Sequence, residues 1–333
     1  LKNRIVFPPM VSRMGDYGSF CTDMAREFYV RVAEGGTGLV IVEAVYTYGP
    51  YPTVLCIHDD AHIDGFKKMT DEIHAKTDAK VSVQINHAMP YIADVHDLSI
   101  GQIEAFYDLY TAAAVRLKKA GFDAVEIHGA HCYMVANFLS LKNKRKDEYG
   151  RTIEGRMKLV LTLYDRMRDA LGKDYPIGIR INADDFTVGG SSLEQARQYA
   201  KKLVELDLAY LSLSAGGRNE DGTRHGQTGF NWPYSDVGPY NGPMGYSGHR
   251  AMPPAYMPDG VNVDLHAAIR KAIQPTKIPT ITAGKIPTPD FAESILQEEK
   301  ADLIAVCRGI LADPDWAKKA MEGRSQDINQ CIY

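Results

Sequence analysis

The sequence has few cysteines, no excess of charge of either sign and no long apolar run. Its five cysteines are scattered without a CxxC pair, so we expect no disulfide framework and predict a cytoplasmic protein. Lys and Arg number 38 against 42 Asp and Glu, a net charge of −4 with His neutral. This balance is not typical of nucleic-acid or membrane-surface binding. No apolar run approaches the roughly 20 residues that span a bilayer. From the charge balance and the absence of such a run, we expect neither nucleic acid nor a membrane as a partner.

The chain also lacks a GxGxxG turn after any apolar run, which argues against a doubly wound dinucleotide-binding sheet. It has instead short β-branched and aromatic runs that alternate with longer helical patterns, the arrangement of repeated βαβ units. Eight such units in 333 residues predict an α/β fold, a (β/α)8 TIM barrel spanning residues 1–324. The expected strands are Arg4–Met10, Gly38–Ala44, Val81–His87, Ala124–Gly129, Ile177–Asn182, Tyr210–Ala215, Pro279–Gly284 and Leu303–Arg308. The expected helices are Asp23–Glu34, Asp60–Lys76, Ile100–Ala120, Ile153–Leu171, Leu193–Leu206, Val263–Ala272, Asp290–Glu298 and Trp316–Gly323.

One connection, residues 216–261, is much longer than the others and is dense in Gly, Pro, Asn and Tyr. Loops of this length are usually functional or disordered. Its aromatic residues favour an ordered lid, since disordered segments are poor in them. Because the segment follows the sixth strand, we expect it over the C-terminal mouth of the barrel, where the active sites of this fold lie.

Polar residues end several of the expected strands. Gln84 lies near the end of the third strand, His128 and His131 end the fourth, and Arg180 lies in the fifth. Each alone is most simply explained as part of a hydrogen-bonded network at the end of a barrel, but their convergence on one rim predicts a functional site. Two imidazoles three residues apart suit zinc, although no further ligand spacing accompanies them. They also suit donation to one substrate oxygen, with the phenol of Tyr133 nearby as a proton source.

The seventh and eighth strands end in glycine beside basic residues: Gly284 with Lys285, and Arg308 after Cys307. In barrels of this kind a phosphate commonly binds at the loops after these two strands. Glycine lets the backbone amides approach an anion, and Lys or Arg supplies charge. The two ends therefore predict a phosphorylated ligand.

Three segments together match the pattern of a known family. The most specific is residues 143–156, NKRKDEYGRTIEGR, which is similar to the signature NxRxDxYGGSxENR. It departs from that signature at Arg151, Thr152 and Gly155. Residues 128–133, HGAHCY, match the family's paired histidines and proton-donor tyrosine, and residues 3–10, NRIVFPPM, are similar to its first strand. On these segments the chain resembles the old yellow enzyme family over nearly its full length.

The resemblance implies FMN bound at the barrel mouth. The residues that it implies for the cofactor are Pro9, Met10 and Ala44 along the isoalloxazine, Gln84 at the pyrimidine edge, Arg180 near N1, and Gly284, Lys285 and Arg308 at the phosphate. Val11 stands where many members have Cys or Thr, and Cys307 stands where Gly is usual in the phosphate loop.

The resemblance also implies an oxidoreductase that reduces an activated C=C bond of an enone, an enoate, or an enoyl or aryl CoA thioester. The β-carbon receives hydride from flavin N5, His128 and His131 stabilise the enolate oxygen, and Tyr133 protonates the α-carbon. We expect electrons from NAD(P)H, directly or through a C-terminal domain, and a homo-oligomer. Three alternatives stay open: a flavin-dependent amine dehydrogenase of the trimethylamine dehydrogenase type, a non-redox phosphate-binding barrel with His128 and His131 as base or metal ligands, and a barrel kept as a binding module.

The last residues, Ile328–Tyr333, are similar to the opening of the CIxCNxxC segment of larger relatives: 2,4-dienoyl-CoA reductase, trimethylamine dehydrogenase and 2-enoate reductase. There, four cysteines hold a [4Fe–4S] cluster between the FMN barrel and a C-terminal flavin domain. We therefore expect residues 325–333 to begin an iron–sulfur segment, with Cys331 as a metal ligand, in a native chain that continues towards an FAD-binding region. The alternative is an ordinary tail cysteine, because one thiolate cannot hold the cluster.

Overall fold

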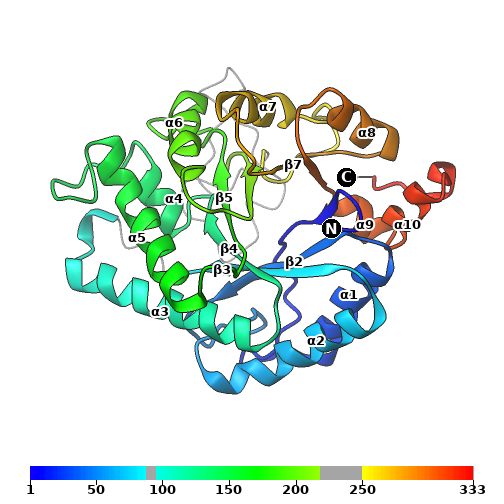
Figure 1. Ribbon diagram of the computed structural model, residues 1–333, viewed down its shortest axis with the longest axis horizontal. Helices are drawn as coiled ribbons and strands as arrows, with labels where there is room; N and C mark the ends of the chain where they lie inside the picture. The colour runs from blue at the N-terminus through cyan, green and yellow to red at the C-terminus, as the bar shows by residue number, and fades with distance from the viewer. Residues whose placement is uncertain (88–94, 218–249, 333) are drawn as a thin grey trace.

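The computed structural model describes residues 1–87, 95–217 and 250–332. In these residues eight parallel strands close into a barrel in chain order, as Figure 1 shows with the helices around it. The strands are β1 (Ile5–Phe7), β2 (Leu39–Tyr46), β3 (Lys80–Asn86), β4 (Ala124–Gly129), β5 (Ile177–Asn182), β6 (Tyr210–Ser214), β7 (Thr280–Ala283) and β8 (Leu303–Ala305). The predicted (β/α)8 barrel is confirmed.

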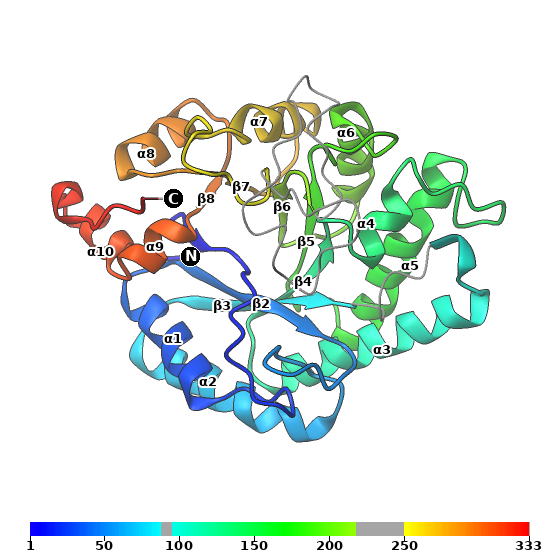
Figure 2. The same ribbon diagram turned by 180° about the vertical axis from the view of Figure 1, so that it is seen from behind.

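The helices of the described ranges form the outer ring, and Figure 2 shows the same ring from behind. They are α1 (Asp23–Glu34), α2 (Ile63–Lys76), α3 (Ile100–Lys119), α4 (Met134–Leu139), α5 (Ile153–Leu171), α6 (Leu193–Leu203), α7 (Val263–Ala272), α8 (Pro289–Gln297), α9 (Arg308–Ala312) and α10 (Trp316–Met321). In Figures 1 and 2 the last two helices lie beside the start of the chain, where the Asn3 side chain donates to the carbonyl of Gly36 over 2.8 Å. None of the helices in the described ranges is long and apolar enough to span a membrane.

Side-chain caps fix several helix starts. The hydroxyl of Thr22 accepts a hydrogen bond from the amide of Ala25, and α1 begins at the next residue. Thr152 accepts in the same way from Gly155 at the start of α5. Ser99 forms a capping box with Gln102 before α3. Because a cap satisfies backbone N–H groups that a helix start leaves unpaired, it sets the boundary locally.

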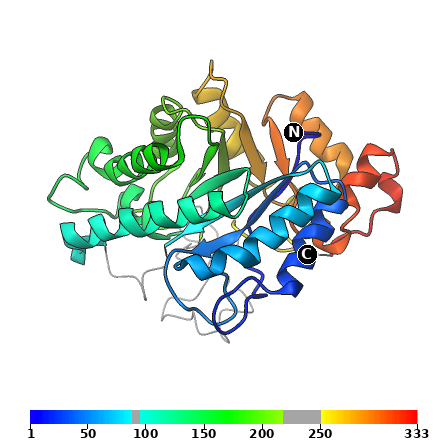
Figure 3. The same ribbon diagram turned by 60° about the horizontal axis from the view of Figure 1, so that its bottom comes forward.

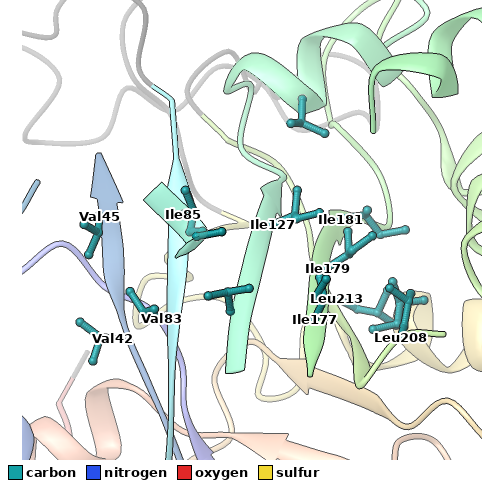
Figure 4. Packing of buried hydrophobic residues seen from close by; sticks show 14 of the residues in the cluster. Val42, Val45, Val83, Ile85, Ile127, Ile177, Ile179, Ile181, Leu208 and Leu213 are labelled. Atoms are coloured by element: carbon teal, nitrogen blue, oxygen red, sulfur yellow. The ribbon is translucent and has the colours of Figure 1, made fainter. Parts of the chain in front are cut away.

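The core has two parts. Outward side chains of the strands pack against the helices, and Figure 4 shows valines and isoleucines of β2 to β5 in this cluster. A smaller apolar cluster fills part of the barrel interior and includes Val6, Leu39, Ile41, Ile281 and Leu303. Strands buried on both faces in this way are expected to be almost wholly apolar. The polar residues inside this barrel are therefore exceptions that need partners.

Several predicted boundaries differ from those observed. The eighth strand was expected to reach Arg308 but ends at Ala305, and Arg308 instead begins α9. The first strand is only Ile5–Phe7, because Pro8 and Pro9 have no N–H for the ladder. Helices α4 and α9 were not predicted. Of the long 216–261 connection, residues 218–249 lie outside the described residues.

Candidate active site

The carboxyl ends of the strands surround a cavity of about 390 Å³, a volume in the range typical of small-molecule sites. Figure 3 shows the strands and the surrounding helices from a tilted direction. The cavity is lined by every residue that the sequence suggested for catalysis or cofactor binding: Pro9, Met10, Ala44, Gln84, His128, His131, Tyr133, Arg180, Gly284, Lys285, Cys307 and Arg308. The fold therefore brings these residues together, while the role of each stays a prediction.

One wall of the cavity is apolar and comes from the ends of β1 and β2. A register shift between Val42 and Val45 interrupts the pairing of β2 with β3, and Ala44 lies on the cavity there. Its neighbour Glu43 is buried and accepts a hydrogen bond from the amide of Ser12. Burial raises the pKa of Glu43 to about 7. Glu43 thus fixes the segment that follows the apolar wall, a contact that sequence reasoning missed.

Gln84 and Arg180 lie on the floor of the cavity. The Gln84 side-chain amide donates to the carboxylate of Glu126 over 2.7 Å. Arg180 donates through Nη2 to the hydroxyl of Ser214 over 3.2 Å, and its buried Nε has no hydrogen-bond partner in the described part of the chain. Burial lowers the pKa of Arg180, an effect that the charge of Glu126 opposes. A guanidinium at the cavity floor favours a ligand that carries or develops negative charge.

His128 and His131 lie side by side at the end of β4, with ring centroids 5.2 Å apart. The Nε2 of His131 hydrogen-bonds the Ser214 hydroxyl over 2.7 Å. Burial lowers the pKa of His131 to about 3 and that of His128 well below its ordinary value. Both rings are therefore neutral near pH 7 and keep an N–H for donation. In the described residues no group of three or more His, Cys, Asp or Glu could hold a metal, so the zinc alternative finds no ligand set there.

A turn in left-handed backbone follows β4. His131 has a φ of 59° and Cys132 a φ of 63°, values that are uncommon for residues other than glycine. Tyr133 comes next, with its ring centroid 4.8 Å from that of His128. The turn thus places a phenol beside the paired imidazoles on the same cavity.

The opposite end of the cavity carries the two predicted phosphate-binding cations. Lys285 donates to the carbonyl of Ala255 over 2.8 Å, and Arg308 donates to that of Pro253 over 2.7 Å. Gly284 has a φ of +126°, and a Cβ there would lie 2.8 Å from the Asn262 amide, so this position requires glycine. The amino group of Lys285 also pairs with the carboxylate of Asp259 over 3.3 Å. The role of the two cations in holding a phosphate stays a prediction.

Part of the predicted lid reaches the cavity. Ala251, Met252 and Pro253 line it, and Arg250 lies 4.4 Å from the centroid of the Phe186 ring after β5. This contact anchors the end of the segment beside the site. Most aromatic residues of the 216–261 segment, Phe230, Trp232 and Tyr234 among them, lie among residues 218–249, outside the described ranges.

The two C-terminal cysteines have different surroundings. Burial raises the pKa of Cys307 to about 11, and the nearby Cys331 adds to the rise, so the Cys307 thiol is protonated at neutral pH. Cys331 is partly exposed. Because the described ranges contain no group of three metal ligands, Cys331 alone forms no metal site there.

Comparison with known proteins identifies the family of this chain. The profile of the NADH:flavin oxidoreductase / NADH oxidase family matches residues 1–94, 88–215 and 247–327. An NADH oxidase from Thermoanaerobacter brockii is 34% identical over 359 aligned positions, which cover 100% of this chain and 50% of that protein. The chain thus spans about half the length of this relative.

Two solved structures share the fold. The 2-naphthoyl-CoA reductase in complex with 2-naphthoyl-CoA superimposes with a TM-score of 0.84 at 24% identity, covering 99% of this chain and 51% of that one. The old yellow enzyme from Pichia sp. AKU4542 gives a TM-score of 0.72 at 24% identity, covering 97% and 84%. Both likenesses establish the barrel.

Proposed function

The chain belongs to the NADH:flavin oxidoreductase / NADH oxidase family, and from that premise we propose that it binds FMN in the cavity and reduces an activated C=C bond. The observation that carries the proposal is the layout of the cavity. Two neutral imidazoles and a phenol lie at one side, an arginine lies on the floor, and two cations beside a required glycine lie at the far end. This layout suits chemistry beside a carbonyl better than hydrolysis.

The residues fit FMN. Pro9, Met10 and Ala44 offer an apolar wall to a planar ring, and the buried, partnerless Nε of Arg180 offers a donor at the floor. Lys285 and Arg308 offer charge for a phosphate. When bound, FMN supplies the hydride. The protein supplies orientation and electrostatics.

At the substrate side, His128 and His131 donate hydrogen bonds to the carbonyl oxygen that becomes an enolate. The Ser214 hydroxyl accepts from Arg180 and can donate its own proton to Nε2 of His131. The neutral ring then carries its proton on Nδ1, which is the donor left for the substrate. Donors already in place stabilise charge that develops in the transition state. The hydroxyl of Tyr133 gives its proton to the α-carbon. The substrate class is an enone, an enoate, or an enoyl or aryl thioester. The thioester is supported by the structural likeness to 2-naphthoyl-CoA reductase.

Purified protein tests this proposal directly. We expect flavin absorption bands, release of FMN on denaturation, reduction by NADH or NADPH under anaerobic conditions, and reoxidation by an enone such as 2-cyclohexenone. Recovery of FAD or of no flavin would refute the cofactor. Reduction by a secondary amine, without reoxidation by any enone, enoate or thioester, would favour the amine dehydrogenase alternative.

The iron–sulfur segment stays a separate prediction. Residues 325–333 carry a single cysteine, Cys331, whereas a [4Fe–4S] cluster needs four ligands. We propose that the full-length protein carries further cysteines and a second flavin site, FAD, through which electrons reach the barrel. Iron and sulfide analysis after anaerobic purification tests this. An absence of iron would leave direct reduction by NAD(P)H.

A further inference from the structure

A polar layer lies directly beneath the cavity, inside the barrel. Its centre is Glu126 on β4, which is fully buried. Glu126 pairs in register with Gln84 on β3 and with Gly178 on β5. Burying an ionisable group in a barrel interior costs free energy unless its neighbours compensate. What surrounds Glu126 therefore indicates why it is there.

The direct contact of Glu126 is with Gln84. The Gln84 Nε2 donates to Glu126 Oε1 over 2.7 Å. A carboxylate only accepts hydrogen bonds, so it fixes which end of the carboxamide turns down towards it. The carbonyl oxygen of Gln84 is then the atom left for a ligand in the cavity. Glu126 thus makes Gln84 an acceptor at the cavity floor.

The second neighbour is Arg180, which Glu126 affects through its charge. The nearest hydrogen-bond partner of Arg180 is the hydroxyl of Ser214, and no ion pair with Glu126 occurs among the described residues. Each group nevertheless shifts the pKa of the other towards its charged form. In a buried, low-dielectric interior such charges interact without contact. Glu126 therefore offsets part of the positive field of Arg180 in the cavity.

A bulky ring closes the layer from below. Gly178 has no side chain, and a Cβ there would lie 2.3 Å from the Tyr210 ring. Tyr210 reaches across from β6, and its hydroxyl lies 3.1 Å from that of Ser82 on β3. The Tyr210 ring belongs to the apolar cluster of the barrel interior, so the polar layer borders that cluster directly.

We propose that Glu126 is a positioning residue of the flavin site, which orients Gln84 as an acceptor and sets the reduction potential of the bound ring by offsetting Arg180. This inference rests on the proposed binding of FMN. A cation near the ring favours its anionic reduced form, so a carboxylate behind that cation disfavours it. The two effects of Glu126, contact and charge, can be separated by substitution.

Glu126→Gln tests the charge. The amide keeps an acceptor for Gln84 and removes the negative charge, so the midpoint potential of the FMN-loaded protein should become more positive. We expect a roughly tenfold change in the ratio of reduced to oxidised flavin, about 30 mV for a two-electron couple. The titration is run with a reference dye at pH 8, where the Glu126 carboxyl is ionised because its pKa is about 7.

Asp302→Asn is the matched control. It also removes one negative charge, but Asp302 lies before β8 at the other end of the barrel, where it binds Arg270 over 3.0 Å. Its midpoint potential should equal that of the wild type. An unchanged potential in Glu126→Gln, or an equal shift in both variants, would overturn the role of charge.

Glu126→Asp tests the contact and also serves if the first variant does not fold. It keeps the charge and withdraws the carboxylate by one methylene, so the potential should stay near that of the wild type while FMN affinity falls roughly tenfold. Wild-type affinity in this variant would overturn the positioning role. If the wild type itself binds no FMN, the proposed function fails as well. If it binds FMN and the variants match it, only this inference fails.

Discussion

Tyr133 is the residue on which the proposed proton transfer depends. Its ring lies beside His128 on the cavity, so Tyr133→Phe removes the proton donor and keeps the ring. We expect oxidation of the reduced flavin by an enone to slow by roughly 10²–10⁴, the usual contribution of general acid catalysis. Reduction of the flavin by NADH or NADPH should stay near wild type. Stopped-flow measurement of the two half-reactions checks this, with Tyr175→Phe, whose hydroxyl bonds the Phe122 carbonyl, as the control. An unchanged oxidative half-reaction would assign the proton to another group.

A second prediction concerns the paired imidazoles of His128 and His131. If His128 and His131 donate to one oxygen, each change to Ala should weaken binding of a phenol inhibitor, followed by flavin absorbance. The double variant should lose less than the sum of the two, because groups that act on one ligand atom are coupled. Ser214 bonds both His131 and Arg180, so Ser214→Ala measures the effect of losing these two contacts while both imidazoles are present. Strictly additive losses would show that the two rings serve different purposes.

The third prediction concerns Lys285, in the connection after β7, as a ligand of the FMN phosphate. Lys285 lines the cavity beside Gly284, and its amino group donates to the carbonyls of Ala255 and Met257 and pairs with Asp259. Lys285→Met should weaken FMN binding roughly 10- to 100-fold, since a charged hydrogen bond contributes about 1.5–3 kcal/mol. Riboflavin, which lacks the phosphate, should bind with nearly unchanged affinity. Titration of the apoprotein with both flavins measures this, and the exposed Lys277 before β7 gives a matched control in Lys277→Met. An equal loss for riboflavin would place the phosphate elsewhere.

Elements with strong local signals could be predicted from the sequence, and short ones could not. Helices α1, α5 and α7 and strands β4 and β5 have the predicted boundaries. The side chain of Thr22 caps the start of α1, and that of Thr152 caps the start of α5. Helices α4 and α9 have six and five residues, too few for an apolar period to appear. The predicted end of β8 is too late because the apolar run continues through Val306, whereas the pairing of β8 with β1 and β7 stops at Ala305.

The candidate site could be predicted at the strand ends, but the layer beneath it could not. Gln84, His128 and Arg180 stand out because they are polar at the ends of apolar strands. Glu126 lies inside such a strand, between Val125 and Ile127, and this was the available signal. Its partner depends on the register of β3 against β4, which periodicity does not determine. The Glu43 contact likewise depends on a register shift in β2.

At the scale of the whole molecule, burial of titratable groups sets how stability depends on pH. Among the described residues, burial lowers the pKa of five histidines: to about 4 for His87, to about 3 for His131 and His266, well below its ordinary value for His128, and in the same direction for the less buried His58. Burial raises the pKa of two carboxyls, Glu43 and Glu126, to about 7. Between about pH 5 and 6 the unfolded chain is largely protonated on the four most strongly shifted histidines, His87, His128, His131 and His266, and the folded chain retains protons on the two carboxyls. The histidines outnumber the carboxyls, so the unfolded state binds about two more protons in this window.

We therefore expect the free energy of unfolding to fall as the pH is lowered from 6 to 5, by about 3 kcal/mol per pH unit for two protons. His266 offers the sharpest test because it lies on α7, away from the cavity, fully buried with its Nδ1 2.7 Å from the Thr282 hydroxyl. His266→Gln keeps a group that can bond Thr282 and cannot take up a proton. Its pH slope should be smaller than that of the wild type by about one proton, or about 1.4 kcal/mol per pH unit. Urea unfolding of both proteins at pH 5.0, 5.5 and 6.0 with saturating FMN measures the difference. Equal slopes would mean that His266 is protonated in the folded state, and a stability that rises as the pH falls would mean that the two carboxyls outweigh the histidines.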